Sequence, residues 1–182
     1  MSGYKHLIKF RTTDITVIIY MVITAILMIV SEGFTNVYGI QLLIRPLIFL
    51  LIVLIIFLDE KYTSKFTNFL HLFYPIILLS YFYGETALLN HIFFSESLDS
   101  LIYGWDELIF GFQPSLEFSL SYPQKWFSEF VNFGYFSYYL LTFGVSFSFF
   151  LLKQEKAERV IFMIINSFFI YYLVFIAFPV AG

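Results

Sequence analysis

One charged side chain lies inside an otherwise apolar stretch of this sequence: Arg45, which precedes Pro46 in the run 37–58. A charge within an apolar helix is costly, so such a residue holds an anionic ligand, forms an ion pair or extends to the nearest polar boundary. If the helix begins near Ile40, Arg45 is about 8 Å from its end and can reach that boundary. We favour an ion pair or an extended side chain over a direct role in holding an anionic substrate.

The histidines are the other candidates for chemistry. His71 lies in the run 66–84, where a hydrogen-bonded packing role is favoured over that of a metal ligand or proton carrier. His6 and His91 fall in polar segments and are expected to be solvated. The spacing of His, Asp and Glu fits no metal site, and the chain has no cysteine. The sequence therefore predicts no catalytic residue, no metal and no cofactor.

The composition indicates the environment of these side chains. Of 182 residues, 60% are apolar and 13% are charged, whereas a soluble domain is about 45–50% apolar and about 25% charged. Too little polar surface remains to cover a soluble domain of this size. The net charge of −3 and the lack of a basic face argue against a nucleic-acid partner. The expected partners are membrane lipids, and the oligomeric state is left open.

Five stretches are long and apolar enough to cross a membrane, for which about 20 residues are needed. The sequence thus predicts an all-α polytopic membrane helix bundle with a single transmembrane domain over residues 1–182. The first stretch follows basic residues but is too long for the apolar region of a signal peptide, so it is expected to be a retained helix. The expected spans are residues 15–31, 37–58, 66–84, 130–152 and 160–182.

The orientation follows from the lysines and arginines between these stretches. Eight of them fall in the N-terminal segment and in the segments 59–65 and 153–159, against one, Lys125, in the segments on the other side. This distribution places the N-terminus in the cytoplasm and Gly182 at the outer or lumenal face of a cell membrane or endomembrane.

The segment 85–129 is the longest part of the chain outside the expected spans. Apolar residues recur every three or four positions between Leu98 and Phe112, which predicts an amphipathic helix at the outer face. Ser97 is the expected N-cap, and Gly111 with Pro114 is expected to end the helix. We expect this helix to pack on the bundle or to cover a site, and a second short helix to begin at Pro123. The adjacent acids Asp106 and Glu107 are interpreted as its solvated face rather than as a cation site.

Two stretches resemble a known family. The run Tyr103-Gly-Trp-Asp-Glu-Leu-Ile-Phe-Gly-Phe-Gln-Pro-Ser115 is similar to the loop before the catalytic core of the type 2 phosphatidic acid phosphatase superfamily, in the branch that includes inositolphosphorylceramide synthases. The run Tyr171–Gly182 looks like that branch's helix leading into a Phe-Pro-x-x-Gly-Pro-Arg motif. The resemblance implies a six-helix bundle that acts on a lipid phosphate at the outer face. Arg45, Asp106, Gln113 and Pro114 would then border the substrate groove, and Phe178, Pro179 and Gly182 would begin the phosphate loop.

The sequence also departs from that family. The arginine that follows Gly-Pro, and the Ser-His and His-Asp motifs that transfer the phosphoryl group, do not occur in residues 1–182. We therefore expect the chain to represent the N-terminal part of a lipid-phosphate phosphatase or phosphotransferase and to be inactive alone. The alternative is a non-catalytic integral membrane subunit or a small permeation element, for which Arg45-Pro46 and the pair His71 and Pro75 are the hints.

Overall fold

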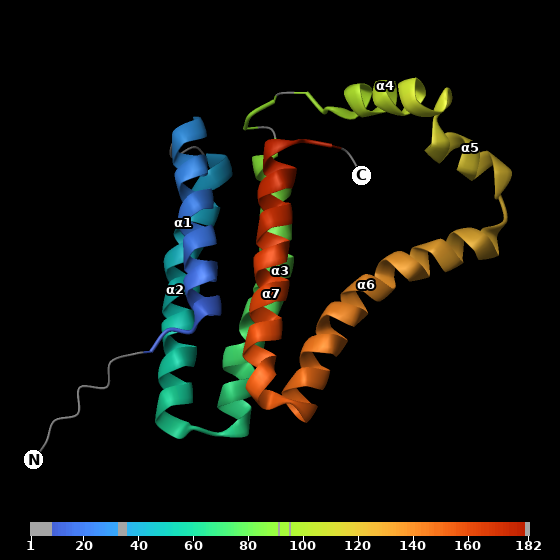
Figure 1. Cartoon of the computed structure of the whole chain (residues 1–182). Coiled ribbons are helices and arrows are strands. Elements are labelled where there is room, and N and C mark those ends of the chain that lie inside the picture. The colour runs from blue at the N-terminus through green and yellow to red at the C-terminus, as the bar shows by residue number, and fades with distance from the viewer. Residues whose placement is uncertain (1–8, 33–35, 91, 95, 181–182) are drawn as a thin grey trace, which may run out of the picture.

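The computed structural model describes residues 9–32, 36–90, 92–94 and 96–180, and this part of the chain is helical without any strand. The expected all-α fold is thereby confirmed. Figure 1 shows the seven helices of this part in chain order. Their bounds are α1 Thr12–Glu32, α2 Asn36–Tyr62, α3 Lys65–Leu89, α4 Asp99–Phe110, α5 Pro114–Ser121, α6 Lys125–Leu152 and α7 Gln154–Ala177.

Five of the described helices, α1, α2, α3, α6 and α7, are long and apolar enough to cross a membrane. Their apolar stretches are 20 to 28 residues long, with mean hydropathies of 1.4 to 2.8. Because a lipid core about 30 Å thick requires about 20 helical residues, the chain is an integral membrane protein. The helices α6 and α7 begin at Lys125 and Gln154, a few residues before the starts expected at 130 and 160.

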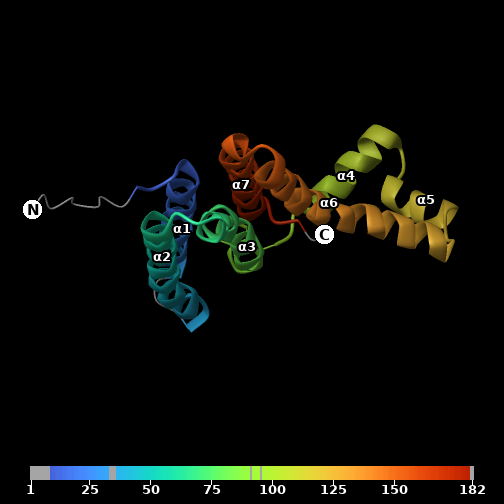
Figure 2. The same cartoon turned by 90° about the horizontal axis from the view of Figure 1, so that it is seen from below.

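The helices α1, α2, α3 and α7 form the packed bundle, with α3 in contact with each of the other three (Figure 2). Aromatic rings fill its centre. Tyr20 of α1 stacks on Phe169 of α7 with ring centroids 4.2 Å apart, and the ring of Phe82 of α3 meets Tyr20 edge-on at 5.1 Å. Interlocked rings of this kind add packing specificity to the burial of apolar surface.

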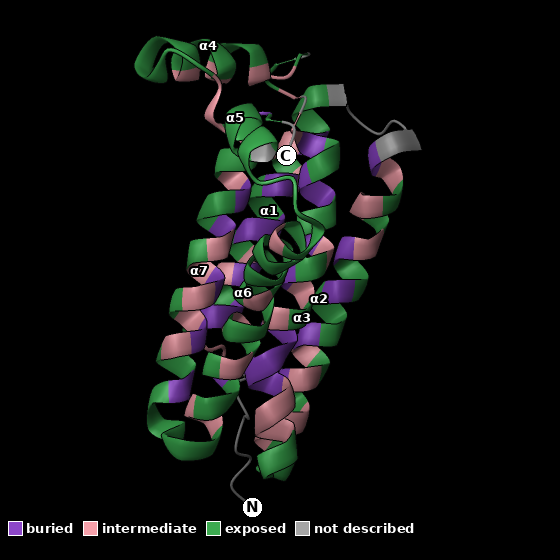
Figure 3. Cartoon of the chain, turned by 90° about the vertical axis from the view of Figure 1, so that its right-hand side faces the viewer, coloured by how far each residue is buried: buried purple, intermediate pink, exposed green. Residues whose placement is uncertain are grey.

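The helix α6 joins the bundle mainly through its C-terminal half. There, Phe143 and Phe147 contact Phe73 of α3, and the helix packs against α7. Towards its N-terminal end, α6 diverges from the bundle, as Figure 1 shows. Buried residues in Figure 3 concentrate on the four packed helices, and Ser146 is the buried residue described on α6. Most of the apolar surface of α6 therefore lies where lipid would contact it.

The connection from α3 to α6 corrects several local expectations. Leu98, and not Ser97, is the N-cap of α4. The Ser97 hydroxyl donates to the Asp99 carboxylate at 2.6 Å and accepts from the Asp99 backbone N–H at 3.3 Å. Gly111 ends α4, as expected, and it does so in the left-handed conformation with φ 75°. Pro114 does not only stop a helix: it occupies the first turn of α5, where a missing N–H costs nothing. The second short helix is thus α5, and the helix that follows Pro123 is α6 itself.

The expected packing of α4 on the bundle is not observed. Within the described residues, α4 buries no side chain, and Trp105, Leu108 and Ile109 are 58%, 84% and 71% exposed. In Figures 1 and 2, α4 and α5 form an arm that extends away from α1 and α2. The amphipathic pattern therefore predicted the helix itself but not the packing of its apolar side chains against the described part of the bundle.

Candidate functional site

Arg45 is buried in the bundle, where it forms a bidentate ion pair with Glu85 of α3. Its Nη1 and Nη2 atoms lie 2.8 and 3.1 Å from the two carboxylate oxygens. The sequence placed Glu85 in the outer segment 85–129, but the structure places it inside α3 with 2% of its side chain exposed. The ion pair among the alternatives for Arg45 is therefore the arrangement observed.

The remaining donors of Arg45 are also satisfied by the bundle. Nε donates to the backbone oxygen of Met21, Nη2 to the hydroxyl of Thr24, and Nη1 to the backbone oxygen of Gln41. A guanidinium has five N–H donors, and all five have a partner here. Tyr81 adds a hydrogen bond to Glu85 at 2.9 Å. This network links α1, α2 and α3 and leaves Arg45 no free donor for a substrate.

A second polar network lies at the end of the bundle where α1 and α3 begin. The His71 ring is buried between two carboxylates, with Nε2 3.0 Å from Asp14 and Nδ1 2.8 Å from Asp59. Each ring nitrogen is therefore within hydrogen-bond distance of a carboxylate oxygen, so the ring links Asp14 of α1 to Asp59 of α2. The hydrogen-bonded packing role expected for His71 is thus observed, with partners that the sequence did not reveal.

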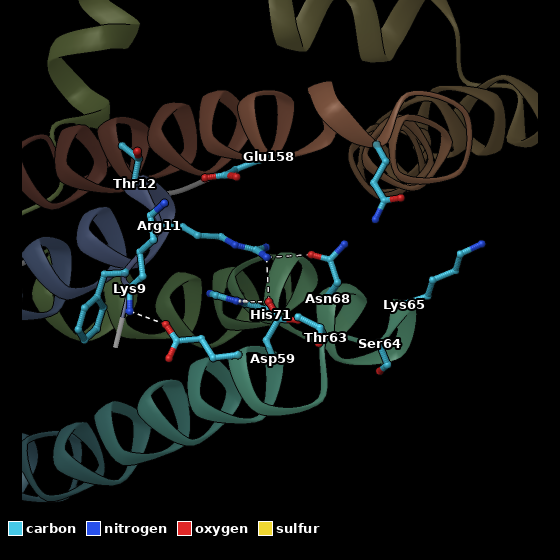
Figure 4. Close-up of a pocket in the computed structure, with 13 residues that line it drawn as sticks. Lys9, Arg11, Thr12, Asp59, Thr63, Ser64, Lys65, Asn68, His71 and Glu158 are labelled. Carbon is cyan, nitrogen blue, oxygen red and sulfur yellow. Dashed lines mark hydrogen bonds and ion pairs between the residues drawn. The ribbon is translucent and has the colours of Figure 1, made fainter. Parts of the chain in front are cut away.

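Further side chains bind the two carboxylates of this network. Tyr74 donates to Asp14 at 2.6 Å. Arg11 Nη2 donates to Asp59 at 2.9 Å and to the Asn68 side chain at 2.8 Å, as Figure 4 shows. The backbone N–H of Arg11 also donates to Asp14, which lies in the first turn of α1. Both ring nitrogens of His71 are occupied, so the histidine is not available to a metal ion, and no metal-binding group of His, Cys, Asp or Glu occurs in the described residues.

A polar cavity of about 600 Å³ opens beside this network, next to Arg11, Asp59 and His71. Its size is within the range of small-ligand sites, about 300–1,000 Å³. The other residues that line it come from the segment before α1, from the end of α2 and the loop after it, and from the first turns of α1, α3 and α7: Lys9, Phe10, Thr12, Glu60, Thr63, Ser64, Lys65, Asn68, Gln154 and Glu158.

Apart from Arg45, the described residues that the family resemblance singled out lie on the arm or at the end of the bundle opposite to the polar cavity. Asp106 is part of α4, and Gln113 is the N-cap of α5, which begins with Pro114. Phe178 and Pro179 follow α7, whereas Gly182 lies outside the described residues, as does His91. The structure does not bring Arg45 to the arm.

The segment after α7 and the segment before α4 are joined by hydrogen bonds. The backbone oxygen of Pro179 accepts from the backbone N–H of Leu98 at 2.8 Å and from the hydroxyl of Ser97 at 3.4 Å. These residues are more than 80 positions apart in the sequence. The end of the run 171–182 is therefore next to the start of α4, the helix in which the run 103–115 begins.

No known protein family, curated protein or solved structure matches this chain. Its site must therefore be inferred from its own geometry.

An apolar cavity of about 550 Å³ lies between α3, α6 and α7. It is on the half of the bundle nearer to Pro179, because its α7 residues belong to the second half of that helix. Aromatic rings dominate its wall, and tyrosine hydroxyls, Ser80 and Thr142 supply the polar atoms. The lining residues are Ile76, Leu79, Ser80, Tyr83, Tyr135, Tyr138, Tyr139, Thr142, Phe168, Tyr171, Tyr172 and Phe175. Such a wall suits an apolar ligand with few polar groups.

Proposed function

We propose that this chain binds a membrane lipid and supplies the substrate groove of a lipid-phosphate phosphatase or phosphotransferase. The tyrosine-lined cavity carries the proposal. It is apolar, it opens between three membrane-spanning helices, and it lies in the same half of the bundle as Phe178 and Pro179. The cavity would hold part of an acyl chain, and the phosphate would lie towards the segment that follows α7.

The resemblance to the type 2 phosphatidic acid phosphatase superfamily supplies the reaction class. The hydrogen bonds from Ser97 and Leu98 to Pro179 support it, because they hold the end of the run 171–182 next to the start of α4, the helix in which the run 103–115 begins. With the basic loops on the cytoplasmic side, this junction faces outward. Asp106, Gln113 and Pro114 would border the groove from the arm.

The proposed role is binding and not catalysis. Phosphoryl transfer needs a nucleophile activated by a base and cationic donors around the phosphate oxygens. The sequence has no Gly-Pro-Arg, Ser-His or His-Asp motif of this family, and Arg45 has no free donor. The catalytic groups would come from residues outside 1–182.

The binding role can be tested by photo-crosslinking. The chain is reconstituted in nanodiscs with phosphatidic acid that carries a diazirine in one acyl chain, and labelled peptides are identified by mass spectrometry. We expect the label on the cavity wall, including Tyr138 and Tyr171, and we expect an excess of unlabelled phosphatidic acid to reduce it.

A cavity-filling variant and a matched surface variant make this test specific. Thr142→Trp places a large ring in the cavity and should reduce the labelling severalfold, whereas Leu50→Trp on the exposed face of α2 should not change it. Uniform labelling over all lipid-facing helices, unaffected by Thr142→Trp, would contradict the proposal.

The lack of catalysis has its own test. The purified chain should release no phosphate from phosphatidic acid above the level without protein. Turnover that His91→Ala abolishes would show that the chain carries its own catalytic machinery.

The alternative function, a non-catalytic membrane subunit, is favoured by one observation: just 6% of the apolar stretch of α6 is buried. The coding sequence that follows Gly182 distinguishes the two functions. Pro-Arg followed by Ser-His and His-Asp motifs would support the enzyme, whereas an immediate stop codon together with uniform crosslinking would support the subunit.

A further inference from the structure

The tyrosine-lined cavity between α3, α6 and α7 differs in polarity from one end to the other. On α3, Ile76 lies near the middle of the helix, whereas Tyr83 is six residues before its last residue. On α7, Phe168 lies nearer to the middle, whereas Tyr171 is six residues before the last residue. The deeper end of the cavity is therefore lined by hydrocarbon side chains, and the end towards the last turns of α3 and α7 carries phenol hydroxyls.

The third wall of the cavity, α6, follows the same gradient. It precedes α7 and runs in the opposite direction, as Figure 1 shows, so Tyr138 lies nearer than Thr142 to the hydroxyl-bearing end. The Thr142 hydroxyl donates to the backbone oxygen of Tyr138 at 2.9 Å. Because its donor is used within α6, Thr142 adds no free donor to the deeper end.

Ring contacts hold the tyrosines in place across the three helices. The ring centroid of Tyr83 on α3 lies 6.0 Å from that of Tyr172 on α7. The ring of Phe168 lies 5.9 Å from Tyr172 and 5.7 Å from Tyr138 on α6. The Tyr172 hydroxyl donates to the backbone oxygen of Leu79 at 3.1 Å, which anchors this row of rings to α3.

Other hydroxyls of the same wall remain available to a ligand. Those of Tyr83, Tyr138 and Tyr171 have no hydrogen-bond partner among the described residues, and their side chains are about half exposed. Hydrocarbon offers no acceptor, so an unpaired hydroxyl next to it costs free energy. A ligand with an acceptor oxygen at this level of the cavity would remove that cost.

The depth of these hydroxyls indicates which acceptor can meet them. α3 and α7 have 25 and 24 residues, so they are about 36–38 Å long and extend about 3–4 Å beyond each side of a hydrocarbon core of about 30 Å. Tyr83 and Tyr171 lie about 9 Å before the helix ends, which is about 5–6 Å inside that core. A tyrosine side chain can reach from there to the boundary, where the ester groups of a glycerol-based lipid lie.

We propose that Tyr83, Tyr138 and Tyr171 bind the ester carbonyl of a glycerol-based membrane lipid, so that the cavity prefers an ester-linked chain to an ether-linked one. A carbonyl oxygen only accepts hydrogen bonds, which matches a wall that offers free donors. The hydrocarbon chain beyond the carbonyl would occupy the deeper, apolar end. This inference rests on the proposed function, because it names the part of the lipid that the same cavity recognises.

Competition between two lipids tests the inference on the full chain. The chain in nanodiscs is crosslinked with the diazirine-bearing phosphatidic acid, and unlabelled phosphatidic acid competes for the cavity. Its two chains are joined to glycerol either by ester bonds or by ether bonds, with the same headgroup and chain length, so the carbonyl oxygens are the difference. We expect the ester lipid to compete about three- to tenfold more effectively, as the loss of one or two hydrogen bonds would produce.

Tyrosine variants connect this preference to the cavity wall. Tyr138→Phe and Tyr171→Phe each remove a hydroxyl and keep the ring, and each should reduce the advantage of the ester lipid by about two- to threefold. The triple variant that also contains Tyr83→Phe should lose the advantage. Tyr62→Phe, at the exposed last residue of α2 and outside the cavity, is the matched control and should keep it. The melting temperatures should equal that of the wild type, because the aromatic rings remain.

The outcomes separate this inference from the proposed function. Equal competition by the two lipids would overturn the ester recognition, but lipid binding would stand if Thr142→Trp still reduced the labelling. An ester advantage that persists in the triple variant, or that Tyr62→Phe reduces equally, would also overturn the recognition, because the carbonyl would then be bound elsewhere. Uniform labelling that neither lipid reduces would overturn both.

Discussion

The guanidinium of Arg45 and the carboxylate of Glu85 face each other within the membrane-spanning part of the bundle, with N–O distances of 2.8 and 3.1 Å. Arg45 is on α2 and Glu85 is on α3, and Arg45 also donates a hydrogen bond to the hydroxyl of Thr24 on α1. The pair therefore connects three helices. Thr24 lies ten residues after Asp14, about 15 Å farther along α1. In this environment neither charge can exchange its partner for water, which makes their pairing specific for one helix arrangement.

Removal of one charge of this pair should destabilise the bundle strongly. We expect Glu85→Ala to lower the free energy of unfolding by about 3–5 kcal/mol, because it leaves Arg45 buried without a counter-ion. Thermal unfolding of the detergent-solubilised chain, followed by circular dichroism, measures this as a lower melting temperature.

The double variant Arg45→Met with Glu85→Met is the matched control. It removes both charges and keeps apolar volume, so it should recover most of the stability that Glu85→Ala loses. A single variant as stable as the wild type would show that the ion pair does not form in the membrane protein.

The network around His71 predicts coupling between α1 and α3. His71→Phe and Asp14→Asn each disturb the hydrogen bond of 3.0 Å that joins the two side chains. Because both variants remove the same interaction, their effects on the free energy of unfolding should differ from additivity by about 0.5–3 kcal/mol. Chemical denaturation of the two single variants and the double variant measures this difference.

An exposed residue provides the reference for that comparison. Asp14→Asn combined with Lys156→Gln should be additive within about 0.5 kcal/mol, because Lys156 belongs to neither network. If His71→Phe and Asp14→Asn are equally additive, the bond between these residues contributes nothing to stability.

The spans could be predicted from the sequence because they depend on local composition. A run of apolar residues long enough to cross the lipid core is a property of consecutive positions, and each expected range falls largely within α1, α2, α3, α6 or α7. The end of α4 at Gly111 was predictable for the same reason. Two local signals compete at Pro114, because a proline can follow the end of one helix or begin the next. The expectation that Pro114 only ends a helix was wrong, since it begins α5.

The polar partners could not be predicted because they depend on residues far apart in the chain. Glu85 is 40 positions from Arg45, and Asp14 is 57 positions from His71. From the sequence alone, a carboxylate near the end of an apolar run is assigned to the surface. Its burial becomes favourable only when a cation on another helix lies opposite, and the sequence does not reveal that cation. The two cavities could not be predicted for the same reason, because each is lined by side chains from several helices.

The orientation of the chain in the membrane can be tested with single cysteines, since the sequence has none. Ser121→Cys at the end of α5 should react with a membrane-impermeant maleimide in intact cells, because the arm is expected at the outer face. Lys156→Cys near the start of α7 should react only after the membrane is permeabilised.

Both positions are exposed, so the difference should reflect the side of the membrane and not burial. A cysteine-free chain is the negative control, and labelling of detergent-solubilised protein shows that both thiols are reactive. Labelling of Lys156→Cys from outside would invert the topology and remove the outward placement of Pro179.

The arm should lie at the membrane interface instead of extending into water. Trp105, Leu108 and Ile109 are exposed in the chain, and burial of one such side chain in an apolar environment is worth about 1.5–3 kcal/mol. The sequence has two tryptophans, so Trp126→Phe leaves Trp105 as the sole reporter. In vesicles, lipids brominated near the headgroup should quench its fluorescence more than lipids brominated near the chain end, because interfacial helices insert only about 5–10 Å. Emission like that of a water-exposed indole, without quenching by either lipid, would show that α4 extends into water and would contradict this prediction.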